Sequence, residues 1–256
     1  MVMPWDNTGI NVGNINQTGN IIGTASTENK PKIAIGLPYN GKLDMEFVER
    51  TWGPLRYIPL GWCIKSLFLT KVPSISVARD TLVKSALSGN CDYILFLDSD
   101  HIVENVDPNA ALGQLYSVIN KDPNSKEGKI VSALYRAKQS TGFNWAAWVR
   151  YDPAKHGVLQ GVEKKKGYIS MMEWTGNFLE IDVVGLGFCL IDMRVFREVP
   201  GPWFNWNEQG EISEDFFFCE LAKKYGFNTK VFTDLRLSHL GNLKVLSDGK
   251  VTTQEM

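Results

Sequence analysis

Two carboxylates one residue apart, Asp98 and Asp100, have the spacing that most directly indicates chemistry in this sequence. They follow residues 92–97, an apolar run that predicts a buried strand. Open α/β sheets bind ligands at the carboxyl ends of their strands, and two acids there can hold a divalent cation that bridges diphosphate oxygens. A polar turn, or an aspartate that caps a helix, explains the same triplet without any chemistry.

Four side chains elsewhere have the types that could complete such a site. Arg79 lies in a predicted helix, the acids Glu214 and Asp215 open another, and His239 closes a short apolar strand. Plainer interpretations exist for each of them. An arginine is usually a surface residue, the helix dipole favours acids in a first turn by about 0.3–1 kcal/mol, and a lone histidine in an apolar strand is usually part of the core.

The order of several segments resembles the nucleotide-sugar glycosyltransferases of the GT-A fold, in their broad family-2-like group. The resemblance covers residues 32–241. It depends on the following blocks, in this order: Leu37-Pro38-Tyr39-Asn40-Gly41, Ser76-Val77-Ala78-Arg79-Asp80, Asp98-Ser99-Asp100, Asp182-Val183-Val184-Gly185-Leu186-Gly187-Phe188, Pro202-Trp203-Phe204, Ser213-Glu214-Asp215 and Ser238-His239. The second block has Asp80 where the family has an asparagine.

This resemblance implies a role for each block. Nucleotide-sugar contacts are implied for Pro38, Tyr39, Asn40, Arg79, Asp80, Asp98, Ser99 and Asp100. Metal ligation is implied for Asp100 and His239, with Asp98 contacting either the metal or the ribose. Gly187 would allow close approach of the sugar, and the aromatic faces of Trp203 and Trp206 would suit stacking on a sugar ring, although they could also be core. Asp215, with Glu214 beside it, would face the acceptor as general base.

The function expected is therefore transfer of a sugar from a UDP- or GDP-sugar to an acceptor hydroxyl, with Mn²⁺ or Mg²⁺ as cofactor and inversion of the anomeric centre. The acceptor could be a glycan, a protein or a small molecule. A haloacid-dehalogenase-like phosphatase would use Asp98 as nucleophile. In that family the acid pair is normally followed by Gly and then by Thr or Val, whereas His101 and Ile102 follow it here. A noncatalytic sugar-binding or structural protein is another alternative. A nucleotidyltransferase usually has a Gly-rich basic loop, which residues 37–41 lack. No role is assigned to His101 or His156.

The elements that would position these residues alternate between strands and helices. Apolar runs predict strands over residues 32–37, 92–97, 130–134, 145–151, 168–172, 178–184, 188–191, 230–232 and 236–239. Helices are predicted over residues 74–87, with Val77, Leu82, Val83 and Ala86 as the apolar side, over 109–119, and over 214–225, with Phe217, Leu221 and Ala222 as anchors. This order predicts an α/β GT-A fold, an open mostly parallel sheet flanked by helices with a smaller mixed β acceptor region.

Composition limits the class of protein further. The 27 basic and 28 acidic side chains nearly cancel, so a nucleic-acid partner is not expected. Four isolated cysteines indicate reduced core thiols, and no apolar run reaches the ~20 residues of a membrane span, so a cytoplasmic location is expected. Residues 1–30 form an Asn- and Gly-rich arm that could mediate homo-oligomerisation. Residues 31–256 form one domain, with a nucleotide-binding half (about 31–135) and an acceptor half (about 136–245).

Overall fold

The fold is taken from a computed structural model of the chain. It describes residues 30–39, 41–56, 63–71, 74–137, 144–156, 164–165, 167–171, 174–206, 212–240, 243–245 and 251–253. The expected N-terminal arm lies outside these residues except for Lys30, and so does Asn40 of the expected nucleotide loop. None of the helices in these ranges has the length and apolar character needed to cross a bilayer.

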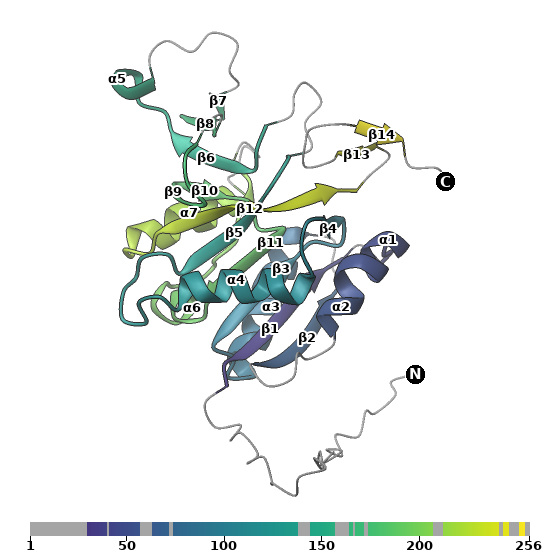
Figure 1. Cartoon of the computed structure of the whole chain (residues 1–256). Helices are drawn as coiled ribbons and strands as arrows, with labels where there is room; N and C mark the ends of the chain where they lie inside the picture. Colours follow the sequence, from purple (N-terminus) through teal and green to yellow (C-terminus); the bar gives the residue numbers. More distant parts are fainter. Residues whose placement is uncertain are drawn as a thin grey trace, which may run out of the picture.

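A central sheet of mixed direction forms the body of the molecule (Figure 1). Its middle strands are, in spatial order, β2 (Ile64–Thr70), β1 (Lys32–Pro38), β3 (Tyr93–Leu97), β11 (Phe188–Asp192), β5 (Ile130–Tyr135) and β12 (Thr229–His239). Every one of them except β11 runs in the same direction. Strands β1, β3, β5 and β11 are buried almost throughout, which is why their sequences are continuous apolar runs and not alternating patterns.

Strand β12 pairs with further strands at this side of the sheet. Its first residues pair with β9 (Phe178–Ile181) and its last with β4 (His101–Val103), both antiparallel. Beyond it lie β13 (Leu243–Val245) and β14 (Val251–Thr253). A second sheet, in the order β10 (Val183–Val184), β6 (Ala147–Arg150), β8 (Tyr168–Ser170) and β7 (Lys164–Lys165), lies above β12 in Figure 1.

Helices follow the strands as the alternating pattern predicts. The longer ones are α3 (Ile75–Ser88), α4 (Pro108–Ile119) and α7 (Glu214–Lys224). The shorter ones are α1 (Met45–Phe47), the π-helical turn η2 (Val48–Trp52), α2 (Gly53–Arg56), α5 (Pro153–His156) and α6 (Arg194–Glu198). Asp107 begins α4 by accepting hydrogen bonds from the amides of Asn109 and Ala110, and Pro108 occupies the first turn, where a missing N–H costs nothing.

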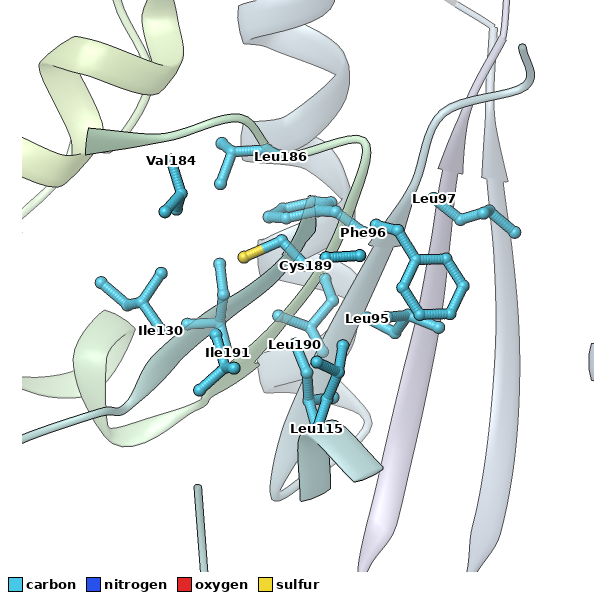
Figure 2. Packing of buried hydrophobic residues seen from close by; sticks show 14 of the residues in the cluster. Leu95, Phe96, Leu97, Leu115, Ile130, Val184, Leu186, Cys189, Leu190 and Ile191 are labelled. Atoms are coloured by element: carbon cyan, nitrogen blue, oxygen red, sulfur yellow. The ribbon is translucent and has the colours of Figure 1, made fainter. Parts of the chain in front are cut away.

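One contiguous apolar core lies between the sheet and these helices. Figure 2 shows Leu95 of β3 and Cys189 of β11 within it, together with Leu115 of α4, and all three side chains are fully buried. On α7, Phe218 stacks on Phe196 at 5.4 Å between ring centroids and lies 5.0 Å from Phe204. This aromatic cluster holds the first turns of α7 against the sheet. All four cysteines are buried and unpaired, as expected.

Several sequence-based expectations about single elements are wrong. Residues 178–184 are two strands in different sheets because Asp182 interrupts them: its carboxylate accepts from the Arg150 amide at 2.7 Å and pairs with Lys223. Residues 230–232 and 236–239 belong to one strand, β12, with an irregularity between Phe232 and Arg236.

The expected apolar sides of two helices also need correction. Val77 of α3 is 53% exposed, and the polar side chains of Ser76 and Arg79 are buried instead. On α7 the buried residues are Glu214, Phe216, Phe218, Cys219 and Ala222, whereas Phe217 and Leu221 are only half-buried. Strands β2 and β4 and the helical segment 45–56 were not predicted at all.

Candidate active site

The acid pair lies in a tight turn between β3 and β4. Asp98 follows the last residue of β3, and its amide donates to the carbonyl of Gly187 at 2.9 Å. The amide of His101 donates to the carbonyl of Asp98 at 3.3 Å, which closes the turn, and the amide of Leu240 donates to the carbonyl of Asp100 at 2.7 Å. The Asp-x-Asp segment is therefore held by backbone bonds to β11's entry loop and to the residue after β12.

Strand register brings two histidines together beside Asp100. In the β4–β12 ladder His101 is directly opposite His239, and their rings stack with centroids 4.3 Å apart and an interplanar angle of 29°. Cross-strand partners lie close enough for their side chains to interact, so the pairing of a three-residue strand is sufficient to create the contact. His101 is 2% exposed.

Asp100 contacts both rings. Its Oδ1 lies 2.9 Å from Nδ1 of His101, and its Oδ2 lies 3.1 Å from Nε2 of His239. Burial favours the neutral acid, but the two histidines outweigh it and hold the pKa of Asp100 well below its usual range. One donor atom from each of Asp100, His101 and His239 can be chosen so that all three lie within 4.8 Å of one another.

The donor set fits a divalent cation. Nδ1 of His239 lies 3.1 Å from the carbonyl oxygen of Arg136, which can only accept, so this nitrogen carries a proton. A neutral ring of that tautomer has only a lone pair at Nε2 to offer Asp100. The contact therefore needs either an imidazolium or a cation bound by both atoms, and a backbone acceptor behind the ring is the usual orientation of a metal-binding histidine.

The Gly185-Leu186-Gly187 segment lies against this group from the β11 side. A Cβ atom at Gly187 would lie 2.6 Å from Cε1 of His101, and one at Gly185 would overlap the hydroxyl of Tyr135. That hydroxyl accepts from the Gly187 amide at 3.1 Å, and the Tyr135 ring is edge-on to His101 at 4.3 Å. The space beside Gly187 in the Cβ direction is thus filled by His101.

Arg79 joins the acid pair to helix α7. It is 3% exposed, and its Nη2 donates to Oδ1 and Oδ2 of Asp98 at 2.9 and 3.1 Å while Nη1 donates to Oε1 of Glu214. Burial opposes the charge, but Asp98 and Glu214 outweigh it and raise the pKa of Arg79 above its usual value. Both oxygens of Asp98 are therefore engaged within the protein.

The two acids of α7 lie in different surroundings. Glu214 is buried, and burial raises its pKa although Arg79 opposes the shift. Asp215 is half-buried, and its Oδ1 accepts from the Ser213 hydroxyl and from the Phe216 amide at 2.9 Å. Oδ2 makes no hydrogen bond with the described residues. Glu214 is therefore paired with a buried guanidinium, whereas Asp215 has one carboxylate oxygen, Oδ2, that makes no hydrogen bond with the described residues.

The remaining expected contacts are dispersed or take part in packing. Pro38 is buried in β1 beside Thr70, and the Tyr39 amide donates to the Thr70 carbonyl at 3.1 Å. The carboxylate of Asp80 accepts from the Trp203 amide at 3.3 Å, and the Trp203 indole donates to the Val199 carbonyl at 2.7 Å. Ser99 is half-buried in the turn, and Trp206 is 44% exposed.

The structure thus brings together Asp98, Asp100, Arg79, Glu214, Asp215, Gly187 and His239 through contacts to one another or to shared partners. It adds His101 and Tyr135, for which the sequence indicated no role. A signal for His101 was its position next to Asp100 in a chain with only three histidines. Tyr135 had no comparable signal.

Comparison with known proteins gives a likeness of fold. No protein-family model and no curated protein sequence matches the chain. The solved structure of A197 from STIV is similar with a TM-score of 0.56 and 17% identity, over 88% of this chain and 95% of that one. CMP:2-keto-3-deoxy-manno-octonic acid synthetase complexed with CTP has a TM-score of 0.43 and 10% identity, covering 81% and 90% of the two chains. Apo-UDP-glucose pyrophosphorylase has a TM-score of 0.37 and 12% identity, covering 68% and 57%.

These identities are low enough that the likeness concerns the fold alone. Together with the sheet order described above, the similarity to A197 supports the expected α/β fold class, with a large central sheet whose middle strands run mostly in one direction and are flanked by helices.

Proposed function

We propose that this protein is a metal-dependent glycosyltransferase that moves a sugar from a UDP- or GDP-sugar to an acceptor hydroxyl. The observation that carries the proposal is the pairing of Asp100 with His239 at the carboxyl end of β3, together with an oriented carboxylate, Asp215, linked to the same turn through Arg79 and Glu214. Asp100 and His239 are suited to hold a cation that binds a diphosphate, and Asp215 is suited to accept a proton.

The reaction needs a leaving diphosphate to be stabilised and a hydroxyl to be activated. A divalent cation held by Asp100 and His239 would supply Lewis-acid stabilisation of the departing diphosphate. The acceptor oxygen attacks the anomeric carbon, the bond from that carbon to the diphosphate oxygen breaks with its electron pair, and the hydroxyl proton passes to Asp215.

The contacts of α7 support Asp215 as the base. Hydrogen bonds to Oδ1 fix the carboxylate in one orientation and leave Oδ2 for the acceptor hydroxyl. Glu214 is bound to Arg79 and is better suited to positioning the helix than to accepting the proton. Direct attack on the face opposite the leaving group inverts the anomeric centre.

Asp98 is poorly suited to the rival role of a phosphatase nucleophile. Both of its oxygens accept from one nitrogen of a buried arginine, so attack on phosphorus would have to disrupt a buried ion pair. Absence of a trapped phosphoenzyme at Asp98 after incubation with a phosphate ester is therefore expected.

A thermal-shift panel tests the proposal directly. UDP, GDP, dTDP and CMP would each be added with Mn²⁺ and with a chelator. A ligand that binds only the folded state stabilises it by about 2.7 kcal/mol at a hundredfold excess over Kd, so the correct nucleotide should raise Tm in Mn²⁺ alone. Release of the nucleoside diphosphate from its sugar conjugate then identifies the donor. No Tm shift with any nucleotide in Mn²⁺ would contradict a nucleotide-sugar enzyme.

A further inference from the structure

We infer that the cation site of this chain consists of Asp100, His101 and His239, that Asp98 is not a ligand, and that the site binds Mn²⁺ or Zn²⁺ in preference to Mg²⁺. The inference rests on the proposed function for its biological purpose and deepens it. Its evidence is a set of contacts that stand on their own, so metal binding can be tested separately from sugar transfer.

The first observation is the state of His101. The side chain is almost completely buried, and neither ring nitrogen makes a hydrogen bond to any described residue, although Nδ1 lies 2.9 Å from Oδ1 of Asp100. Leaving a buried polar group without a partner costs about 1–3 kcal/mol. A cation between Nδ1 and Asp100 would give this nitrogen a bonded partner, because its present contact with Asp100 lacks hydrogen-bond geometry.

The second observation is that the protein fixes this ring in place. His101 is held opposite His239 by the β4–β12 ladder, its ring lies edge-on to Tyr135, and the absence of a side chain at Gly187 provides the room that it fills. The two imidazoles and Asp100 converge from one turn and one strand end. For bonds of about 2.1 Å, two ligands are about 3.0 Å apart at the right angle of an octahedral site and about 3.4 Å apart at a tetrahedral angle. The spacing of 3.1 Å between Asp100 Oδ2 and His239 Nε2 lies within that range.

The third observation removes Asp98 from the ligand set. Its two oxygens accept from Nη2 of Arg79, which is itself 3% exposed and also bound to Glu214. Metal ligation by Asp98 would weaken its ion pair with that buried arginine, because the cation would compete for the same carboxylate charge. Within the described residues, the group of metal-binding side chains contains His101 in its place.

The composition of the site determines its preference among cations. Two imidazoles and one carboxylate suit borderline transition metals, whereas Mg²⁺ prefers oxygen ligands and retains its waters. We expect Mn²⁺ to bind at least ~10-fold more tightly than Mg²⁺, and Zn²⁺ more tightly than Mn²⁺. The comparison is made by displacement of Mn²⁺, followed through its electron paramagnetic resonance signal. Equal affinities for Mn²⁺ and Mg²⁺ would overturn the preference.

The ligand set can be tested on the unmodified chain. The sequence has three histidines, so protein labelled with ¹⁵N-histidine gives three ring systems. Zn²⁺ should shift the ring nitrogens of His101 and His239 and leave those of His156 unchanged, since His156 is on α5 and bonded to the Asp152 amide. A shift confined to His239 would overturn the inference. Because no residue is replaced, failure of a variant to fold cannot obscure the result.

Variants provide the second test. His101→Gln and His239→Ala should each weaken Mn²⁺ binding by at least ~10-fold, a range already seen when only the partners of ligands are changed. His156→Gln is the matched control and should have unchanged affinity. Asp98→Asn should retain Mn²⁺ affinity within about threefold. A loss with Asp98→Asn as large as with Asp100→Ala would return Asp98 to the ligand set.

Failure of this inference and failure of the proposed function are distinguishable. If both rings shift with Zn²⁺ but no sugar nucleotide binds, the metal site stands and the glycosyltransferase proposal fails. If transfer depends on Mn²⁺ but only one ring shifts, the proposed function stands and the site composition is wrong.

Discussion

The guanidinium of Arg79 and the carboxylate of Asp98 form an ion pair in which Nη2 lies 2.9 Å from Oδ1 and 3.1 Å from Oδ2. The pair joins helix α3 to the end of β3, and the second contact of Arg79, with Glu214, extends the connection to α7. The buried guanidinium of Arg79 therefore connects three elements of the candidate site, α3, β3 and α7. The first acid of the Asp-x-Asp segment is bound in this ion pair, and the second contacts the histidines.

Removal of the buried Arg79 guanidinium should destabilise the fold strongly. Arg79→Met leaves Asp98 and Glu214 without their counter-charge, so we expect the free energy of unfolding in urea to fall by about 3–5 kcal/mol. Arg56→Met, at an exposed position of α2, is the control and should change it by less than about 0.5 kcal/mol. Arg79→Met combined with Glu214→Gln should lose less than the sum of the single changes, whereas simple additivity would show that the pair is not coupled.

Nucleotide binding should depend on metal through Asp100. In the unmodified protein, the affinity for the correct nucleoside diphosphate should fall when Mn²⁺ is replaced by chelator. In Asp100→Ala the two conditions should give equal, weak affinity while the far-ultraviolet circular dichroism spectrum is retained, because the side chain is 40% exposed and outside the apolar core. Equal affinity in Mn²⁺ and chelator for the unmodified protein would contradict a metal-bridged diphosphate.

Turnover should depend on Asp215 far more than on Glu214. Asp215→Asn removes the proton acceptor and should lower kcat about 10²–10⁴-fold while sugar-nucleotide binding survives. Glu214→Gln should have a smaller effect on kcat, and Asp234→Asn, an exposed acid, should have none. Proton NMR of fresh product should show the anomeric configuration opposite to that of the donor. Retention would leave Asp215 with a role in acceptor positioning only.

A methyl group at Gly187 should disturb the histidine pair. Gly187→Ala would place Cβ 2.6 Å from Cε1 of His101, so the ring has to move, and we expect weaker Mn²⁺ binding together with a stability loss of about 1–3 kcal/mol. Gly113→Ala on α4 is the matched control. Its Cβ would meet nothing within 4 Å, and it should stabilise the protein by about 0.5–1 kcal/mol. Undiminished Mn²⁺ affinity in Gly187→Ala would separate this glycine from the site.

Cys219 should make stability fall at alkaline pH. Burial raises the pKa of its thiol from 9.0 to about 12, so the folded state binds the proton more tightly than the unfolded state does. This contribution is complete below pH 9 and is lost as pH rises through the folded pKa, at up to about 1.4 kcal/mol per pH unit. The stability difference between the unmodified protein and Cys219→Ala, measured by urea unfolding, should therefore shrink from pH 8 to pH 10.5. A constant difference would contradict the raised pKa.

Local sequence determined the elements that are long and apolar enough to be recognised by themselves. The runs that became β1, β3, β5 and β11 are buried on both faces, so each reads as a strand without knowledge of its neighbours. The position of Asp98 and Asp100 at the end of β3 follows directly from that reading. Helix α7, with acids in its first turn, was equally visible because capping preferences and apolar spacing are local properties.

Only the tertiary structure decided which side chains meet. The contact between Asp100 and His239 spans 139 positions, and β4 is too short, at three residues, to produce a periodic pattern, so nothing local indicated that His101 would face His239. The burial of Arg79 depends on carboxylates supplied by β3 and α7, 19 and 135 positions away. Strand register and ion-pair partners depend on long-range packing, and for that reason the proposed ligand set includes His101, which lies on a strand that the sequence pattern did not predict.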